Sequence, residues 1–229
     1  MKPLVSVIVP VHNGERFVGE ALASVMNQTC QPLEVLAIDD GSSDRSVAII
    51  QSFPTVHCIV QPNAGVGAAR NRGVQESTSE FLAFLDQDDI WLPGKIEAQL
   101  RLALADPSLD YVLTWQKRFL QHGTERPKWA RPGTIDVPLK AADPSALFVR
   151  RSSFLRVGLF DPSYTMAPDS DWFFKAKDLG LRSAWLPDVL LLRRVHAENN
   201  SRFALGSAEL RRVALGSIRR QRTATSDPS

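Results

Sequence analysis

Short apolar runs alternate with helix-like patterns along the first half of the chain. Residues 5–11 (VSVIVPV) are almost all apolar, and residues 17–26 then place apolar side chains at helical spacing. The alternation continues with strands expected at 35–38, 58–60 and 81–85 and helices expected after 42–44 and over 65–75. Strands joined through helices pair in parallel, and strands this apolar are typically covered on both faces. The pattern predicts an α/β fold with a mixed, mostly parallel sheet flanked by helices.

The periodicity is lost between Gln116 and Pro144. This stretch is rich in basic residues and holds four prolines, which favour a long surface excursion over core structure. Regular patterns then return, with strands expected at 146–149, 183–186 and 190–195 and helices at 153–157 and 170–179. We therefore expect one domain over residues 1–206, built from halves at 1–115 and 116–206, and an appended segment over 207–229.

The appended segment has apolar residues at helical spacing among five arginines. Its simplest interpretation is a solvated terminal helix. A basic amphipathic helix can also lie on an anionic membrane surface, so peripheral contact with the inner face of a membrane is a second hypothesis.

Composition and charge narrow the classes of partner. The chain has 229 residues, 44% of them hydrophobic and 23% charged, as expected for one globular domain. Its 27 basic and 25 acidic side chains leave a net charge of +2, which argues against nucleic acid as a partner. No run approaches the roughly 20 apolar residues that cross a bilayer. We therefore expect a cytoplasmic location.

An acidic cluster, Asp86, Asp88 and Asp89, follows the apolar strand at 81–85. Ligands of open parallel sheets bind at the carboxyl ends of the strands, and Mg²⁺ or Mn²⁺ is usually held there by one or two carboxylates with phosphate oxygens and water. A calcium loop starting at Asp86 is excluded, because Ile90 and Trp91 stand where a ligand and a glycine are needed. The cluster predicts a metal–diphosphate site, and a solvated acidic turn is the alternative.

A second acidic turn, Asp39 and Asp40, ends another apolar strand. The residues that follow, at 42–44, are explained as a helix cap. A cap does not explain the two aspartates, and a carboxylate at a strand edge can accept the ring N–H of a uracil or bond a ribose hydroxyl.

A glycine-rich segment at 61–73 (QPNAGVGAARNRG) follows a strand and opens a helix. It resembles a dinucleotide fingerprint, but Arg70 stands in place of the third glycine. A nicotinamide-dependent oxidoreductase is thus a weaker alternative. Glycines at a helix start, with arginines one turn later, suit a diphosphate equally well.

Two late segments complete the candidate chemistry. Asp169 or Ser170 could cap the helix that follows, which leaves one of Asp169 and Asp171 as a candidate general base. His196 follows the last expected strand, and an isolated histidine is more often structural than a ligand.

Taken in order, these segments resemble family 2 glycosyltransferases of the GT-A fold over residues 6–201. The matching stretches are 6–14 (SVIVPVHNG), 22–29, 37–44 (AIDDGSSD), 63–73 (NAGVGAARNRG), 85–93 (LDQDDIWLP), 169–172 (DSDW) and 194–201 (RVHAENNS).

The resemblance implies roles for individual residues. Residues expected at the donor nucleotide and its phosphates are Pro10, His12, Asn13, Asp39, Asp40, Asn63, Gly65, Arg70, Asp86 and Gln87. Asp88 is expected to bond the metal directly, with Asp86 and His196 as further metal-site residues and Asp89 as the substitute ligand. Many relatives have Glu-Asp before an aromatic at the base, whereas here Pro168 replaces the Glu, so Asp169 and Asp171 both remain candidates.

The resemblance also implies an activity. It is transfer of a sugar, with inversion, from a nucleoside diphosphate donor, most simply a UDP-sugar, with Mn²⁺ or Mg²⁺. Residues 1–115 would bind the donor, and residues 116–206 would bind an acceptor that the sequence does not identify, such as a glycan, a lipid-linked glycan, a peptide or a natural product. A domain of this type that binds a nucleotide sugar or carbohydrate without turnover is the alternative, ahead of the oxidoreductase.

Overall fold

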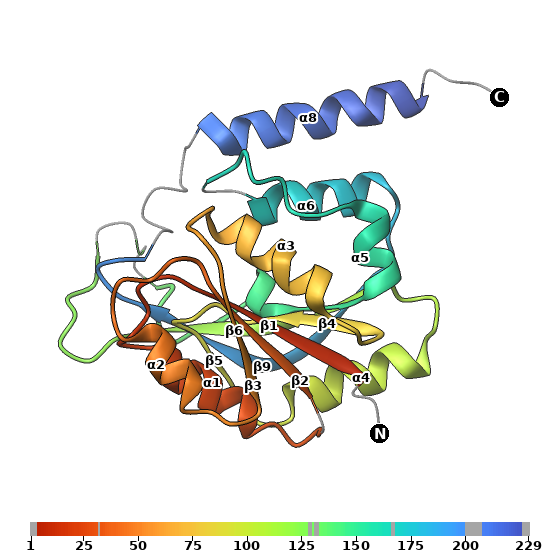
Figure 1. Ribbon diagram of the computed structural model, residues 1–229. Helices are drawn as coiled ribbons and strands as arrows, with labels where there is room; N and C mark the ends of the chain where they lie inside the picture. The colour runs from red at the N-terminus through yellow and green to blue at the C-terminus, as the bar shows by residue number, and fades with distance from the viewer. Residues whose placement is uncertain are drawn as a thin grey trace.

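The described part of the protein is built on one nine-stranded sheet, seen edge-on in the computed structural model of Figure 1. The structure describes residues 4–31, 33–127, 130, 133–165, 168–199 and 208–225, with side chains to residue 221. The strand order is β3-β2-β1-β4-β8-β6-β9-β5, with β7 paired to β6. The strands are β1 (Val5–Val11), β2 (Glu34–Asp39), β3 (Val56–Val60), β4 (Phe81–Phe84), β5 (Ile90–Trp91), β6 (Tyr111–Leu120), β7 (Pro138–Leu139), β8 (Leu147–Arg150) and β9 (Ser183–Val195).

The sheet is mixed. The first four strands in this order are parallel, β8 is antiparallel to both β4 and β6, and β9 is parallel to β6. The predicted mixed, mostly parallel α/β sheet is confirmed. Because β1 lies between β2 and β4 and is covered on both faces, all seven of its residues are buried.

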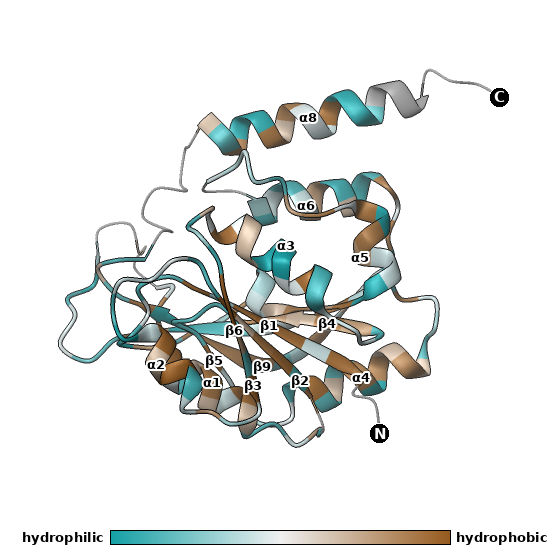
Figure 2. Ribbon diagram, viewed as in Figure 1, coloured by the Kyte–Doolittle hydropathy of each residue, from teal (hydrophilic) through white to brown (hydrophobic). Residues whose placement is uncertain are grey.

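Helices cover both faces of the sheet (Figure 1). α1, α2 and α4 lie on one face, α3, α5 and α6 lie on the other, and α8 packs on the outer side of α6. The bounds are α1 (Val18–Met26), α2 (Ser46–Gln51), α3 (Val66–Glu76), α4 (Lys95–Ala105), α5 (Arg151–Val157), α6 (Pro168–Asp178) and α8 (Ala208–Thr225), with a short 3₁₀ turn, η1 (Pro144–Ala146). Figure 2 shows mostly apolar strands between two layers of helices that carry both apolar and polar residues. Within the described residues, no helix has the length and apolar character that a membrane span requires.

α3 sits unusually close to the sheet because a glycine faces β1. A Cβ built on Gly73 would lie 2.4 Å from Cγ2 of Ile8, so a larger residue would push the helix away. The close approach holds the start of α3, and with it the glycine-rich segment, beside the carboxyl ends of β1 and β2.

Several elements differ from the sequence-based expectation. α4, β5, β6 and β7 were not predicted, and part of β6 and all of β7 lie in the stretch expected to be irregular. The two late strands expected at 183–186 and 190–195 form one strand, β9, whose register against β6 shifts around Pro187 and Asp188. The shift accommodates the proline, and the displaced carbonyl of Asp188 accepts a hydrogen bond from Thr114 Oγ1 at 2.6 Å.

The expected division of the domain into two halves does not coincide with a boundary between these elements. Its internal boundary, between residues 115 and 116, falls inside β6, so both expected halves contribute to one sheet. The boundary at 206 and 207, and residues 200 and 201 at the end of the late motif, lie outside the described residues.

Candidate functional site

The predicted motifs meet at one edge of the sheet. The turns after β1, β2 and β4 begin at the carboxyl ends of three neighbouring parallel strands, and residues 193–196 at the end of β9 join them through hydrogen bonds to the turn after β4. This is the edge at which open α/β sheets bind ligands.

Asp39 presents a carboxyl oxygen that has no partner within the described structure. The residue is 1% exposed, and its Oδ1 accepts a hydrogen bond from the backbone N–H of Ser42 at 3.0 Å. Its Oδ2 is buried and without a hydrogen bond. A buried carboxylate oxygen left unbonded is costly, and such atoms mark places where a ligand supplies the missing donor.

Asp40, the neighbouring acid, is already fully engaged. Its Oδ1 accepts hydrogen bonds from Gln61 Nε2 at 2.7 Å and from the Ala64 N–H at 2.9 Å. Its Oδ2 accepts the N–H of Gly65 at 2.8 Å. Asp40 therefore shapes the glycine-rich loop, and the Gly65 N–H that was expected near a diphosphate is used inside the protein.

The turn after β1 is fixed by side chains from two other turns. The N–H of His12 donates to Gln87 Oε1 at 2.8 Å, and Gln87 Nε2 donates back to the carbonyl of His12 at 3.1 Å. Asn13, at φ 48°, accepts the Ser43 N–H on its Oδ1 at 2.8 Å. These three predicted residues thus join the turns after β1, β2 and β4 into one surface.

The other two predicted residues of this region are placed differently. Pro10 is buried within β1, beyond the last residue paired with β4, so its missing N–H costs no bond to that strand. Asn63 is exposed, with its Nδ2 3.1 Å from Nδ1 of His12. Asn63 also lies tightly against Gly41, at φ 76°, where a Cβ would come within 2.9 Å of the Asn63 nitrogen.

Three carboxylates at the end of β4 lie within reach of one cation. Single oxygens of Asp86, Asp89 and Asp143 all lie within 4.8 Å of one another. Ser145 holds the group together, because its Oγ donates to Asp89 Oδ2 at 3.0 Å and accepts the N–H of Asp86 at 3.0 Å. Such an all-oxygen set suits a hard divalent cation.

Sequence reasoning did not identify Asp143. It precedes η1 and accepts the N–H of Ser145, so the only local signal, an aspartate before a proline, is the ordinary signal of a turn. Its Oδ2 pairs with Arg193. Only the fold brings it to the acids that follow β4.

Asp88 is held apart from that group by the end of β9. Its Oδ2 accepts hydrogen bonds from His196 Nε2 at 2.9 Å and from Asn199 Nδ2 at 3.0 Å. Burial alone would raise the pKa of Asp88, but the hydrogen bond and charge of His196 and the charge of Arg193 lower it below its ordinary value. The structure thus groups Asp89, rather than Asp88, with Asp86. His196, which was expected at the metal, forms a hydrogen bond with Asp88.

The pKa values of Asp86 and Asp89 are shifted in the opposite direction. Burial, together with the neighbouring charges of Asp143 and Asp88, raises the pKa of Asp86. Burial and the charge of Asp88 raise the pKa of Asp89 well above its ordinary value. Ionisation of Asp86 and Asp89 is therefore unfavourable unless a cation lies nearby.

Two arginines partly compensate this charge. Arg70, 4% exposed, donates to Asp86 Oδ1 at 2.5 Å and lies over the ring of Phe160 at 5.6 Å. Arg193 pairs with Asp143, and the charge of that acid raises the pKa of the guanidinium. Arg70 thus fixes the orientation of an acid, while Arg193 lies among the carboxylates.

Arg194 points to the other side of β9. Its guanidinium lies between the rings of Phe17 and Phe119, at 4.9 Å and 4.8 Å from their centroids. It donates to the carbonyl of Asp88 at 2.9 Å and to Glu20 at 2.6 Å. Arg194, the first residue of the 194–201 motif, therefore anchors the turn after β4. The arginine that lies next to the acids is its neighbour, Arg193.

Asp169 and Asp171 face different surroundings. Asp171 pairs with Lys175 at 2.6 Å along the same helix. Asp169 lies within electrostatic range of Arg70 and Asp143; burial raises its pKa, the charge of Arg70 opposes that rise, and the charge of Asp143 adds to it. Of the two, Asp169 is the one near the acidic cluster.

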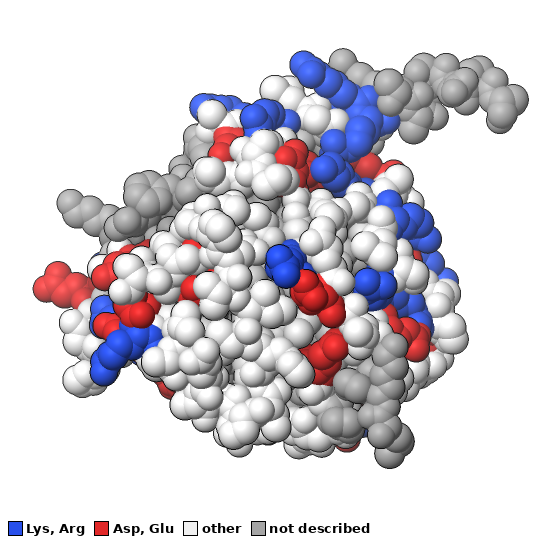
Figure 3. Space-filling view, viewed as in Figure 1, with Lys and Arg blue, Asp and Glu red and all other residues white. Residues whose placement is uncertain are grey.

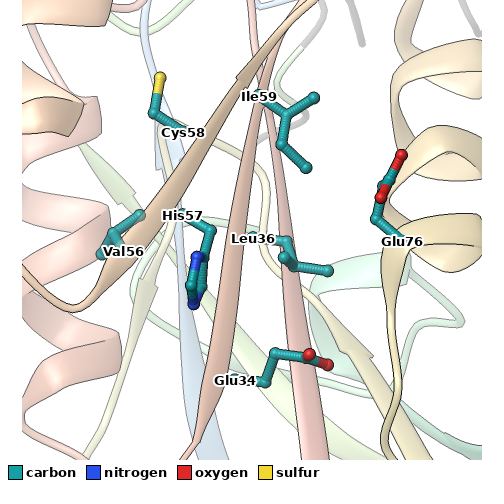
Figure 4. Close-up of a pocket in the computed structure, with 7 residues that line it drawn as sticks. All are labelled: Glu34, Leu36, Val56, His57, Cys58, Ile59 and Glu76. Atoms are coloured by element: carbon teal, nitrogen blue, oxygen red, sulfur yellow. The ribbon is translucent and has the colours of Figure 1, made fainter.

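A hollow of about 480 Å³ opens elsewhere on the sheet. Its lining is Glu34, Leu36, Val56, His57, Cys58, Ile59 and Glu76. Figure 4 shows Leu36 and Ile59 on the side of the sheet that faces Glu76 of α3. These residues come from the early parts of β2 and β3 and the end of α3, away from the carboxyl ends of the strands, so we place the functional site at the acids and not in this hollow.

The model of one protein family covers most of the chain. The family described as Glycosyl transferase family 2 matches residues 6–165. The chain belongs to this family. Its members are glycosyltransferases, and an uncharacterized glycosyltransferase of Rickettsia typhi is 28% identical over 220 residues, covering 90% of this chain and 69% of the relative.

Solved structures share the GT-A fold. TarS 1-349 of S. aureus in complex with UDP-GlcNAc superposes with a TM-score of 0.74 at 21% identity, covering 94% of this chain and 66% of that one. The mannosyltransferase PcManGT of Pyrobaculum calidifontis, in complex with GDP-Man and Mn²⁺, superposes with a TM-score of 0.66 at 19% identity over 100% of this chain. The family 2 chain spans 66% of each solved chain, so it corresponds to part of these proteins.

We expect Asp89→Asn to flatten the pH dependence of stability in EDTA. Because the folded-state pKa of Asp89 is raised, the wild type loses stability as pH rises from the unfolded value, about 3.9, through the folded one. Asparagine does not ionise, so the stability of the variant relative to wild type should increase across this window. Urea midpoints at acidic and neutral pH measure the effect, and a constant difference between the two proteins would contradict it.

Proposed function

We propose that this family 2 chain transfers a sugar from a UDP-sugar to an acceptor hydroxyl, with inversion and with a divalent metal ion. The observation that carries the proposal is the placement of the carboxylates. Asp86, Asp89 and Asp143 form an oxygen-lined group after β4, the unbonded Asp39 oxygen lies at the end of β2, two strands away, and Asp169 interacts electrostatically with Asp143. A nucleoside, a diphosphate with its metal and an acceptor hydroxyl need these three kinds of group.

The nucleoside end favours uracil. Asp39 offers one unbonded oxygen, because Oδ1 already accepts the Ser42 N–H. Uracil has one ring N–H to donate, whereas guanine presents a ring N–H beside an amino group and calls for two acceptors. The similarity to TarS, solved with UDP-GlcNAc, supports the same choice.

The metal site fits Mn²⁺ or Mg²⁺. Asp86, Asp89 and Asp143 would hold the ion, with Asp88 beside them and oriented by His196 and Asn199. When bound, the ion supplies positive charge that stabilises the departing diphosphate. PcManGT, a fold neighbour, is solved with Mn²⁺, which supports this cofactor class. Arg193 adds a fixed positive charge at the same place.

At the acceptor end we assign the base to Asp169. Asp169 lies in the first turn of α6, near the acidic cluster, and its raised pKa makes it a stronger base than an ordinary aspartate. In direct displacement, the carboxylate takes the proton of the acceptor hydroxyl as its oxygen attacks the anomeric carbon from the side opposite the leaving diphosphate. One base suffices, and the configuration inverts.

The two alternative functions fit less well. An oxidoreductase would use the backbone N–H groups of the glycine-rich loop for a pyrophosphate, but those of Ala64 and Gly65 bond Asp40. A binding domain without turnover would not need Asp169 held beside the acidic cluster. The acceptor itself we leave as a hydroxyl of unassigned chemistry.

Asp39→Asn should weaken UDP binding by about tenfold or more. The amide would turn a donor toward the uracil N–H, so an attractive contact becomes a repulsive one. Calorimetric titration with UDP and Mn²⁺ measures the change, with GDP expected to bind wild type more weakly than UDP. His57→Ala, in the hollow, is the matched control and should bind UDP as wild type does; the reverse pattern would place the nucleotide in the hollow.

Removal of the metal should abolish turnover of the donor. Hydrolysis of a UDP-sugar should stop in EDTA and return with excess Mn²⁺, because the charge on the diphosphate is otherwise unopposed. In Asp88→Asn, excess Mn²⁺ should leave the rate at least about a hundredfold below wild type, since the carboxylate charge beside the site is lost. Full activity in EDTA would contradict the requirement for a metal, and full activity of a folded Asp88→Asn protein would contradict the role given to the Asp88 charge.

Asp169→Asn should lower kcat by about a hundredfold or more while UDP binding persists. The reason is that the amide cannot accept the acceptor proton. Asp171→Asn is the matched control, because that acid pairs with Lys175. It should keep kcat within a few-fold of wild type. If only Asp171→Asn loses activity, the assignment of the base is reversed.

A further inference from the structure

α8 is attached to the rest of the protein by one face. On that inner face Val213 and Ser217 are buried against α6. Asp178 at the end of α6 accepts hydrogen bonds from Ser217 Oγ at 2.7 Å and from Arg220 Nε at 2.8 Å. Near the start of the helix, Glu209 accepts hydrogen bonds from Thr165. The orientation of α8 is thereby fixed.

The outer face of α8 combines apolar and basic side chains. Arg211, Leu215, Ile218 and Arg219 follow one another at intervals that place them on one side of a helix, opposite Val213 and Ser217. All four are exposed, with Leu215 at 55% and Ile218 at 47%. A helix face that meets only water usually carries polar residues, so two large apolar side chains among arginines need an explanation.

Charge distinguishes this helix from the remainder of the chain. α8 contains five arginines and one glutamate, whereas the whole chain has a net charge of +2. Its only acid, Glu209, is bonded on the inner face. Figure 3 shows Lys and Arg atoms gathered along the upper edge of the molecule, over α8. The outer face is therefore positive as well as apolar.

We propose that the outer face of α8 docks onto an anionic lipid surface. In this arrangement the helix, about 27 Å long by its rise per residue, lies parallel to the membrane. Leu215 and Ile218 insert between the headgroups, and the arginines bond lipid phosphates. A second copy of this chain is a poorer occupant, because a symmetric contact would bring two arginine-bearing faces together.

Vesicle binding tests the proposal with the whole chain. We expect co-sedimentation with vesicles of equal parts phosphatidylglycerol and phosphatidylcholine, and none with phosphatidylcholine alone. The double variant Arg211→Glu/Leu215→Asp should bind the mixed vesicles at least about tenfold more weakly, because it loses attraction for lipid phosphates and an inserted side chain.

The matched control is Arg101→Glu/Leu104→Asp on α4. It makes the same changes at exposed positions, with Leu104 at 53%, on the opposite face of the molecule (Figure 1). It should bind vesicles as wild type does. The proposal is overturned if wild type does not distinguish the two vesicles, if the control loses as much binding as the α8 variant, or if the α8 variant abolishes a dimer of the chain rather than vesicle binding.

A reporter variant keeps the test valid if the α8 double variant does not fold. Ile218→Trp places an indole at an exposed position of the outer face. The wild type has five tryptophans, so the emission of the added indole is taken as the difference between the variant and the wild type. This difference emission should shift to the blue, and be quenched by brominated lipid, on addition of the phosphatidylglycerol vesicles. An emission spectrum that does not change would refute docking by this face.

Discussion

The cost of gathering negative charge at one end of a buried sheet governs the organisation of this protein. The acids around the end of β4 are Asp86, Asp88, Asp89, Asp143 and Asp169. Carboxylates taken out of water repel one another unless cations and hydrogen-bond donors are fixed among them. Arg70 from α3, Arg193 from β9 and Ser145 from η1 supply such groups. These contacts connect α3, β9 and η1, which are distant in the chain, to the acids of one site. A divalent ion would relieve the repulsion that remains.

This constraint separates acids that shape the site from those available to a substrate. Asp40 accepts hydrogen bonds from the glycine-rich loop, and Asp171 pairs with Lys175. Asp39 keeps one oxygen unbonded, and Asp169 stays beside the cluster. In each of these two pairs, Asp39 with Asp40 and Asp169 with Asp171, one residue stabilises the surrounding structure and the other is available to the site. The division follows from strand and helix periodicity, which points neighbouring side chains in different directions.

Much of the fold and of the site can be predicted from the sequence, because apolar runs that end in acidic turns are visible locally. The turns at 39–40 and 86–89, the glycine-rich helix start and the sheet class follow from such patterns. β6 was not recognised from the sequence, because its second half places three polar residues in a row, Gln116 to Arg118, and forms a strand through pairing with β9. Asp143 was missed for a related reason, because its neighbours indicate only a turn. The choice between Asp169 and Asp171 depends on which of the two lies near Arg70 and Asp143 in the folded chain, which spacing alone does not decide.

The irregularity in β9 sets which arginine meets the acids. Thr114 of β6 pairs with Leu186, yet Gln116 pairs with Leu191, so β9 advances three residues further than β6 across the bulge. An odd advance inverts the parity of the strand, sending side chains that would have pointed to one face to the other. Arg193 thereby reaches Asp143, and Arg194 enters the aromatic pair. Inserting or deleting a single residue at the bulge would exchange the positions of the Arg193 and Arg194 guanidinium groups. The length of this irregular stretch, which contains no catalytic residue, therefore determines which positive charge would lie beside a departing diphosphate.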